Sequence, residues 1–418
     1  MFAASRRERH AGRVRYPAPP MKILVLCYEY PPIGGGGGRV AQAIAGQLAA
    51  RGHAVRVQTA ALGTRSVREK VDGVEVFRTA SLRQREDTCA VHEMGLFCAT
   101  SFIPTLRHIA MWKPDVIHAH FAMPTGLLAW AAHSLTGVPY VLTAHLGDVP
   151  GGVPDQTDTL FRLVDPLARR VWENAAACTA VSTFVQELAE RAYGRRVERI
   201  LNGIDLRESA IRNPQPSGAR QTAEGGPQGE GGAPSQSAIR PPHLVFVGRF
   251  NPQKNAPFLI DALARLRDLA WKLTMVGDGP DMPAVCERIE AHGLADRVRL
   301  IGWRKSADVH RLLADADILC MPSLSEGLPV AAVEALSHGL AIAGSDIPGL
   351  RDVLEPGVNG IAAPVNDAAG YARGLRRLLV NADTLHAMQA ASWEKARAFD
   401  LGAIAAQYER VLLSACGH

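Results

Sequence analysis

The chain has 418 residues, 47% of them hydrophobic and 21% charged, and carries a formal net charge of +5. These values indicate a soluble globular protein with enough apolar material for two domains. The net charge is too small to indicate a nucleic-acid partner, although it suits a protein that handles phosphates or rests on an anionic membrane surface. No uninterrupted apolar run reaches the roughly 18 residues that would span a bilayer.

The first residues and the cysteines bear on where the protein works. Residues 1–20 lack the apolar centre of a signal peptide, and Met21 stands directly before a strand-like run. We therefore expect residues 1–20 to be a disordered arm or a misassigned start. The seven cysteines form no CxxC pair, which favours free thiols in a reducing compartment. Together these features predict a cytoplasmic protein.

Strand-like and helix-like segments alternate through the first half of the chain. A buried strand is predicted over 22–28, and a helix is predicted over 39–51 because its apolar residues recur on one face. Further strand-like runs lie at 54–60, 71–79, 115–120, 139–145 and 177–182. This alternation favours a parallel sheet with helices on both faces. We predict an N-terminal Rossmann-like domain over 21–205.

The composition changes after Asp205, where Gly, Pro, Ser and Gln dominate and large apolar residues almost vanish. This predicts a flexible linker over 206–241. Alternating segments then resume and predict a second domain over 242–395. A final helix, within 396–418, is expected to cross back to the first domain. The predicted fold class is α/β, with two doubly wound parallel-sheet domains facing across a cleft.

Five consecutive glycines, residues 34–38, follow the first predicted strand and precede a helix. Glycine lets backbone amides approach a ligand closely, and a helix N-terminus favours negative charge, so a diphosphate is the expected guest. No GK[ST] follows, and the glycines are too bunched for a dinucleotide fingerprint. A flexible turn without a ligand is the alternative.

Histidines stand at the ends of two predicted strands, His118 and His120 in one and His145 in the other. In open parallel sheets the ligand crevice lies beyond these strand ends. The HxH spacing puts the first two on one face, but no third metal ligand is evident, so we expect no metal site. We select His145 as a site residue, with His120 and Asp148 on the acceptor side.

Two groups of charged residues follow strands in the second half. Arg249 and Lys254 stand just past the strand at 243–248, where two cations can clamp a diphosphate. Glu326 follows the strand at 317–323, and Glu334 lies eight residues later in an otherwise apolar helix, where a sugar or ribose diol would satisfy it. Solvated surface charges are the alternative, and paired carboxylates also occur in glycoside hydrolases.

Together these motifs resemble the family 4 retaining glycosyltransferases of the GT-B fold, the group 1 glycosyl transferases. The resemblance covers nearly the whole chain from Met21 onward. It is carried by glycines and an arginine after the first strand, by GR…K, and by E-x7-E. Their residues are Gly35, Gly36, Arg39, Val40, Gly248, Arg249, Lys254, Glu326 and Glu334.

This resemblance implies a role for each motif residue in a nucleotide-sugar site. Arg249 and Lys254 would hold the donor diphosphate, Glu326 would bind sugar hydroxyls, and Glu334 would bind the ribose. His145 would lie beside the transferred sugar. The remaining implied donor contacts are Gly36 and Gly37 beside the phosphates, Gly302 and Trp303 at the base, and Gly327, Leu328 and Pro329 through their backbone.

The resemblance also implies the substrates. A UDP- or GDP-sugar is the expected donor, and no cofactor or divalent metal is expected. The expected acceptor is a glycan, a lipid-linked saccharide or a lipid in surface polysaccharide biosynthesis. The apolar segment 95–112, with basic residues near it, is interpreted as a core helix or as a patch that touches the inner membrane.

Two other functions fit the same scaffold. One is a nucleotide-sugar epimerase, which product analysis would separate from a transferase. The other is a non-catalytic protein that only binds nucleotide-sugars. The presence of all four charged residues of the GR…K and E-x7-E motifs argues against the second, because a protein without activity could lose them.

Overall fold

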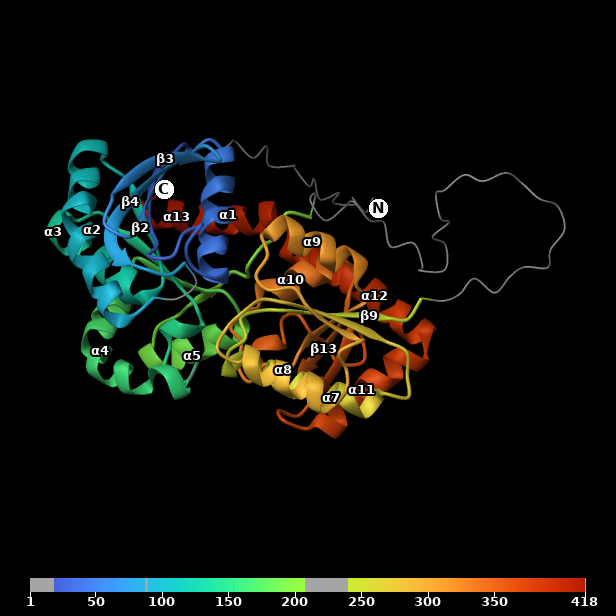
Figure 1. Ribbon diagram of the computed structural model, residues 1–418. Helices are drawn as coiled ribbons and strands as arrows, with labels where there is room; N and C mark the ends of the chain where they lie inside the picture. Colours follow the sequence, from blue (N-terminus) through green and yellow to red (C-terminus); the bar gives the residue numbers. More distant parts are fainter. Residues whose placement is uncertain (1–18, 87–88, 153, 207–239, 418) are drawn as a thin grey trace, which may run out of the picture.

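The computed structural model describes residues 19–86, 89–152, 154–206 and 240–417. Two α/β domains stand side by side in this part of the chain, the N-terminal one blue to green and the C-terminal one yellow to orange (Figure 1). The arm expected at 1–20 and the linker expected at 206–241 lie outside the described residues, apart from their ends.

The N-terminal domain is built on an eight-stranded sheet in the order β3-β4-β2-β1-β5-β6-β7-β8. Its strands are β1 (Lys22–Leu26), β2 (Ala54–Leu62), β3 (Val67–Val71), β4 (Val74–Arg83), β5 (Val116–His120), β6 (Tyr140–Ala144), β7 (Ala177–Ala180) and β8 (Glu198–Arg199). Its helices are α1 (Gly36–Ala50), α2 (Val91–Trp112), α3 (Leu127–Thr136), α4 (Pro154–Asn174) and α5 (Thr183–Tyr193). Apolar residues of the central strands form the core.

The C-terminal domain has a six-stranded parallel sheet in the order β11-β10-β9-β12-β13-β14. Its strands are β9 (His243–Val247), β10 (Lys272–Val276), β11 (Val298–Leu300), β12 (Ile318–Met321), β13 (Ala341–Ser345) and β14 (Gly360–Ala363). Its helices are α7 (Ala256–Leu263), α8 (Met282–Ala291), α9 (Ser306–Asp315), α10 (Val330–Ser337), α11 (Ala368–Val380) and α12 (Ala382–Ala396). The predicted fold class of two doubly wound domains is therefore confirmed.

Two local predictions are wrong. The run 71–79 is not one strand, because Asp72 and Gly73 form a two-residue turn with φ values of 50° and 82°. This turn makes β3 and β4 an antiparallel hairpin at the sheet edge, as an Asp-Gly pair favours. The helix predicted from residue 39 begins instead at Gly36, so three of the five glycines are helical.

The last helix, α13 (Leu401–Ala415), packs on the N-terminal domain, where Figure 1 shows it in red beside α1. Tyr408 and Leu412 are fully buried in the core cluster of β1 and α1. Two backbone hydrogen bonds hold the segment before α13 against the end of the N-terminal domain. The Ile204 N–H donates to the carbonyl of Phe399 at 2.8 Å, and the Ile204 carbonyl accepts from the Leu401 N–H at 3.0 Å. The final helix thus belongs to the N-terminal core.

Glu409 ties α13 to the N-terminal domain through hydrogen bonds with Arg51 and His53. Its Oε2 accepts from Arg51 Nη2 at 2.6 Å, and its Oε1 lies 2.8 Å from His53 Nε2. Burial alone would raise the pKa of Glu409, but hydrogen bonds from Arg51 and His53 outweigh it and hold the pKa below its usual value. The carboxylate therefore stabilises the fold in its ionised form.

We expect Glu409→Gln to lower the free energy of unfolding by about 1–2 kcal/mol at pH 7, since hydrogen bonds to a charged group are lost and Arg51 is partly solvated. Because the folded pKa is depressed, this contribution is present above pH 4.5 and is lost as the pH falls below it. Urea titrations of both proteins at pH 7 and pH 4 measure the loss of unfolding free energy and its dependence on pH. Glu187→Gln, at an exposed residue of α5, is the control, and an equal penalty at both pH values would contradict the assignment.

Candidate functional site

The sheet order of the C-terminal domain brings two loops together at the carboxyl ends of the strands. β9 and β12 are distant in sequence but adjacent in the sheet, so the loops that follow them meet at one edge. The loop after β9 carries Arg249 and Lys254, and the loop after β12 carries Glu326. This is the edge at which open parallel sheets bind ligands.

Lys254 and Glu326 form a largely buried ion pair at this edge. Lys254 Nζ donates to Glu326 Oε1 at 2.6 Å, and the Ser323 hydroxyl donates to the same oxygen at 2.7 Å. A Cβ on Gly248 would lie 3.4 Å from the Lys254 stem, so the glycine lets the lysine lie close to the strand end. The Glu326 side chain is only 6% exposed. Both donors use the same carboxylate oxygen, Oε1.

The other predicted donor residues of this domain lie nearer to solvent. Arg249 has an exposed side chain on the same loop as Lys254. Gly302 follows β11 with a φ of 65°, and its carbonyl accepts a 2.9 Å bond from Gly277. Trp303 is 62% exposed. The assignment of Gly302 and Trp303 to the base of the donor stays a prediction.

Glu334 lies in α10 and is turned toward the N-terminal domain. Its side chain is 5% exposed, and its Oε1 accepts from Arg39 of α1 at 3.3 Å. His310 of α9 lies 4.0 Å from the same oxygen and is held at 3.0 Å by His338. Oε2 of Glu334 is buried and takes no hydrogen bond from any residue within the described ranges. A buried carboxylate oxygen without a donor is costly, which identifies it as an atom that a ligand hydroxyl would satisfy.

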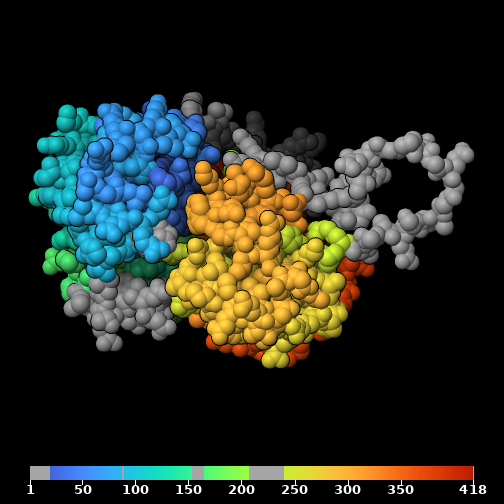
Figure 2. Space-filling model, viewed as in Figure 1, coloured from blue at the N-terminus to red at the C-terminus, as the bar shows by residue number. Residues whose placement is uncertain are grey.

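The N-termini of two helices meet across the domain boundary. α1 begins at Gly36 and α10 at Val330, and a Cβ on Gly36 would lie 3.3 Å from the Val330 side chain. Gly327, in the turn before α10, faces Leu146 so closely that a Cβ would lie 2.9 Å from it. Figure 2 shows the two domains in contact along this boundary. Backbone N–H groups at both helix ends lack helical partners, so negative charge between them is favoured.

The remaining residues of that turn are Leu328 and Pro329. Leu328 is buried, and its carbonyl accepts a 3.1 Å bond from the Asn202 side chain of the other domain. Pro329 occupies the N-cap position of α10. Ser325 adds a second bond between the domains, donating to the Gly152 carbonyl at 2.7 Å. The turn before α10 is therefore held to the N-terminal domain by hydrogen bonds at Ser325 and at Leu328.

His145 directly follows β6 and lies beside the N-terminus of α1. A Cβ on Gly37 would lie 3.3 Å from His145 Nδ1. The imidazole is 7% exposed, and burial lowers its pKa to about 4, so the ring is neutral at pH 7. A neutral imidazole carries one donor and one acceptor nitrogen. Nδ1 faces the glycine helix start, and Nε2 lies 3.5 Å from Nδ1 of His120.

His120 and Asp148, which we predicted on the acceptor side, both lie beneath the surface. His120 is fully buried against His118, with ring centroids 4.3 Å apart, and burial holds its pKa well below the usual value. Asp148 is 3% exposed, and burial raises its pKa to about 7 against the opposing effect of backbone N–H donors. Their assignment to the acceptor side stays a prediction. Both lie next to His145: the His120 and His145 ring centroids are 5.7 Å apart, and the His145 N–H donates to Asp148 Oδ2 at 2.7 Å.

One residue that shapes the site was not singled out from the sequence. A Cβ on Gly349 would lie 1.7 Å from the Glu326 carbonyl oxygen, so the turn Pro348–Leu350 packs directly on the backbone of the loop that holds the carboxylate. The Pro348-Gly349 pair is a turn signal, but it carries no indication of its tertiary contact. Gly349 therefore positions Glu326.

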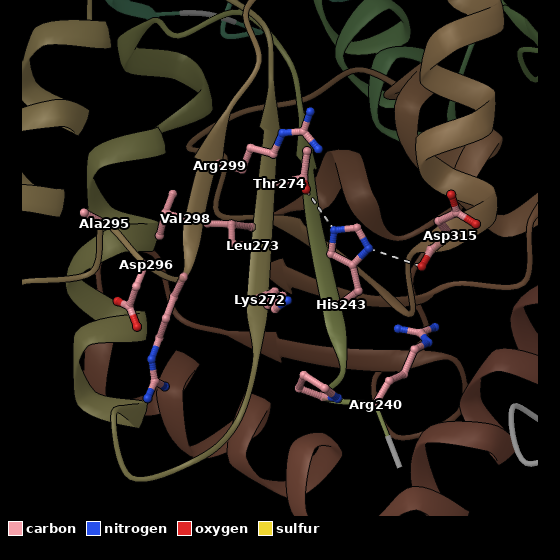
Figure 3. Close-up of a pocket in the computed structure, with 12 residues that line it drawn as sticks. Arg240, His243, Lys272, Leu273, Thr274, Ala295, Asp296, Val298, Arg299 and Asp315 are labelled. Atoms are coloured by element: carbon pink, nitrogen blue, oxygen red, sulfur yellow. Dashed lines mark hydrogen bonds between the residues drawn. The ribbon is translucent and has the colours of Figure 1, made fainter. Parts of the chain in front are cut away.

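A pocket of about 640 Å³ lies elsewhere in the C-terminal domain and contains none of these residues (Figure 3). It is lined by the first residues of β9, β10 and β11, namely His243, Lys272 and Val298. These are the amino ends of the strands, opposite the edge with the motif residues. Within the described ranges, no group of three His, Cys, Asp or Glu side chains could hold a metal ion. No helix in the same part of the chain is long and apolar enough to cross a membrane.

Comparison with known proteins identifies the family. Residues 241–381 match the family described as "Glycosyl transferases group 1", and residues 35–203 match "Glycosyl transferase 4-like domain". The D-inositol 3-phosphate glycosyltransferase of Salinispora arenicola is 30% identical over 63% of this chain, and the match spans 61% of that relative's own length.

Solved structures show the same fold. The sucrose-phosphate synthase of Thermosynechococcus elongatus superimposes with a TM-score of 0.74 and 20% identity, over 93% of this chain and 98% of that one. Anabaena HepE, solved in complex with UDP-glucose, gives a TM-score of 0.71 with 22% identity, over 94% of this chain and 100% of that one. With both halves matched in order and the two-domain architecture shared, the chain belongs to the group 1 glycosyltransferases and has their GT-B fold.

Proposed function

We propose that this protein is a retaining glycosyltransferase that moves a sugar from a nucleoside-diphosphate sugar, UDP- or GDP-linked, to a glycan or lipid-linked acceptor. One observation carries the proposal. Two buried carboxylates, Glu326 and Glu334, stand on either side of the turn before α10, and Oε2 of Glu334 takes no hydrogen bond from any described residue. A nucleoside-diphosphate sugar carries hydroxyl groups at both ends of a diphosphate. Its hydroxyls suit the two carboxylates, and its diphosphate suits the backbone N–H groups of the turn between them.

In this proposal the positive charges of the site lie where negative charge develops during the reaction. Breaking the bond between the anomeric carbon and the phosphate oxygen leaves the electron pair on the diphosphate. Lys254, Arg249 and the α10 N-terminus would stabilise that charge without a metal ion. The acceptor hydroxyl would attack from the face that the diphosphate leaves, and its proton would pass to a phosphate oxygen. This order retains the anomeric configuration.

The neutral imidazole of His145 has a place in the same proposal. Its Nδ1 faces the start of α1, where the transferred sugar would lie between the domains. A neutral ring can hydrogen-bond a sugar hydroxyl, whereas an imidazolium would repel the positive charge that develops on the sugar. Burial, which keeps the pKa near 4, therefore suits this role across the physiological pH range.

The acceptor would be bound by the N-terminal domain. On α2, Met111 is 84% exposed and Ile103 is 53% exposed, and Arg107 and Lys113 lie close to them in sequence. Apolar side chains with neighbouring cations suit contact with an anionic bilayer. We therefore include a peripheral position on the cytoplasmic face of the membrane, with a role in surface polysaccharide biosynthesis, in the proposal.

Thermal-shift measurements against UDP-, GDP- and ADP-glucose test donor binding directly. A ligand at about 100 times its Kd should stabilise the protein by about 2.7 kcal/mol, which is a shift of several degrees. Product analysis with the stabilising donor then distinguishes transfer from epimerisation. Binding without any transfer or hydrolysis would favour a non-catalytic binding protein, and no shift with any nucleotide-sugar would contradict the proposal.

Glu334→Gln should weaken donor binding by about 10-fold or more, because one charge-assisted hydrogen bond to the ribose is lost. Titration calorimetry with the nucleoside diphosphate and its 2′-deoxy analogue measures the effect. The wild type should discriminate between the two nucleotides, and Glu334→Gln should discriminate less. Glu355→Gln, at an exposed carboxylate of the same domain, is the control. Equal discrimination by both proteins would remove Glu334 from the ribose site.

A further inference from the structure

Phe121 has an unusual backbone conformation next to the candidate site. It follows β5 with φ 73° and ψ 130°, a region that bulky L-residues rarely adopt. Its N–H donates to the Thr143 carbonyl at 3.0 Å, and its own carbonyl accepts from Gly126 at 2.9 Å. A strained backbone persists only where surrounding contacts impose it, and such positions concentrate at functional sites.

A single buried carboxylate holds the strained loop. Asp148 Oδ1 accepts from the backbone N–H of Ala122 at 2.8 Å, directly after Phe121. The other oxygen, Oδ2, accepts from the backbone N–H of His145 at 2.7 Å. Asp148 therefore ties the loop after β5 to the loop after β6, and it fixes Phe121 and His145 relative to each other.

The Phe121 ring occupies the space between His145 and the start of α1. It stacks on the imidazole with centroids 4.3 Å apart and an interplanar angle of 28°. Its edge meets Tyr28, with centroids 5.0 Å apart. A Cβ on Gly37 would lie 2.5 Å from Phe121 Cζ, so only glycine allows α1 to approach the ring. The ring is half-buried and packs against the core of the N-terminal domain.

We propose that Phe121 is a positioning residue for the transfer reaction, whose ring fixes the plane of the His145 imidazole so that Nδ1 faces the transferred sugar. This inference rests on the proposed function. With Phe121 on one face and His120 at Nε2, the imidazole cannot turn about its side-chain axis without losing both contacts. The ring packs against the core of the N-terminal domain, but core packing does not require a backbone conformation that favours glycine.

Three substitutions of Phe121 separate positioning from packing. Phe121→Ala and Phe121→Gly should both lower kcat by about 10- to 100-fold, as misplacement of a site group by about 1 Å does, while the donor KM changes less than about twofold. Phe121→Tyr should restore kcat, since it keeps the stacking ring. Glycine accepts the positive φ, so the glycine variant should melt about 2–4 °C above the alanine variant.

The glycine variant decides the question, because it should be more stable than the alanine variant while its kcat stays as low. If kcat instead follows the melting temperature, Phe121 has only a structural role and the inference is overturned. A rise in donor KM at constant kcat would overturn it as well. Phe258→Ala is the control. Phe258 is a half-buried ring of the C-terminal domain that contacts Tyr371 of the same domain, so this variant should lose stability without losing kcat. Absence of transfer by the wild type would refute the proposed function itself, which keeps the two failures distinct.

Discussion

Lys254→Ala is expected to lower the rate of sugar transfer by about 10²- to 10³-fold while leaving the fold intact, because it removes one preorganised cation from the leaving diphosphate. The side chain is not part of the hydrophobic core, and its ammonium group contacts Glu326 at 2.6 Å. The substitution also leaves the Glu326 carboxylate without its counter-charge, which should weaken its hold on the sugar hydroxyls. Steady-state kinetics with saturating donor would show the loss in kcat.

The C-terminal domain offers a matched control for this experiment. Lys272 is an exposed lysine at the amino end of β10, at the opposite edge of the same sheet. Lys272→Ala should leave kcat unchanged, and circular dichroism should show the same helix content for both variants. Full transfer activity in Lys254→Ala would refute the assignment of the diphosphate site.

Gly349→Ala should remove donor binding and destabilise the C-terminal domain together. The added Cβ would lie 1.7 Å from the Glu326 carbonyl oxygen and 2.4 Å from its carbon, so the loop must move. Forcing an extra methyl group into a packed backbone contact costs about 1–3 kcal/mol, and here the displaced atoms belong to the residue whose carboxylate we propose binds the sugar. Thermal melting and donor titration on the same sample measure the two effects.

A second glycine-to-alanine change tests whether the effect is specific to this contact. Gly95 in α2 has no atom near the position of an added Cβ, and alanine is favoured within a helix. Gly95→Ala should therefore retain or gain stability and should bind donor normally. A Gly349→Ala protein with a normal melting temperature and normal donor affinity would show that the loop tolerates displacement.

The sequence predicted the elements of the site better than the contacts between them. Apolar runs such as 243–248 locate strands well, because a buried parallel strand needs continuous apolar residues. The motifs that contain Lys254 and Glu326 assigned both residues to one site, although they did not predict that β9 and β12 are neighbours. The pair formed by Arg39 and Glu334 joins residues 295 positions apart and leaves no local pattern.

Backbone interactions account for most of what the sequence could not predict. Asp148 binds main-chain N–H groups, and these are present at nearly every residue, so no sequence pattern marks its partners. Phe121 adopts a φ that its residue type disfavours, so propensity predicts the opposite. Gly349 was indistinguishable from any other turn glycine until its neighbour was known. Residues that act through such contacts need a structure to be recognised.

The return of α13 to the first domain has a consequence for biosynthesis. The ribosome makes β1 through β8 first, yet Tyr408 and Leu412, which complete the core of that domain, are made more than two hundred residues after β8. The apolar surface of β1 and α1 must therefore stay uncovered while the whole C-terminal domain is synthesised and folds. A fragment that ends at residue 205 would keep that surface exposed permanently, so we expect it to aggregate unless a peptide containing α13 is supplied with it.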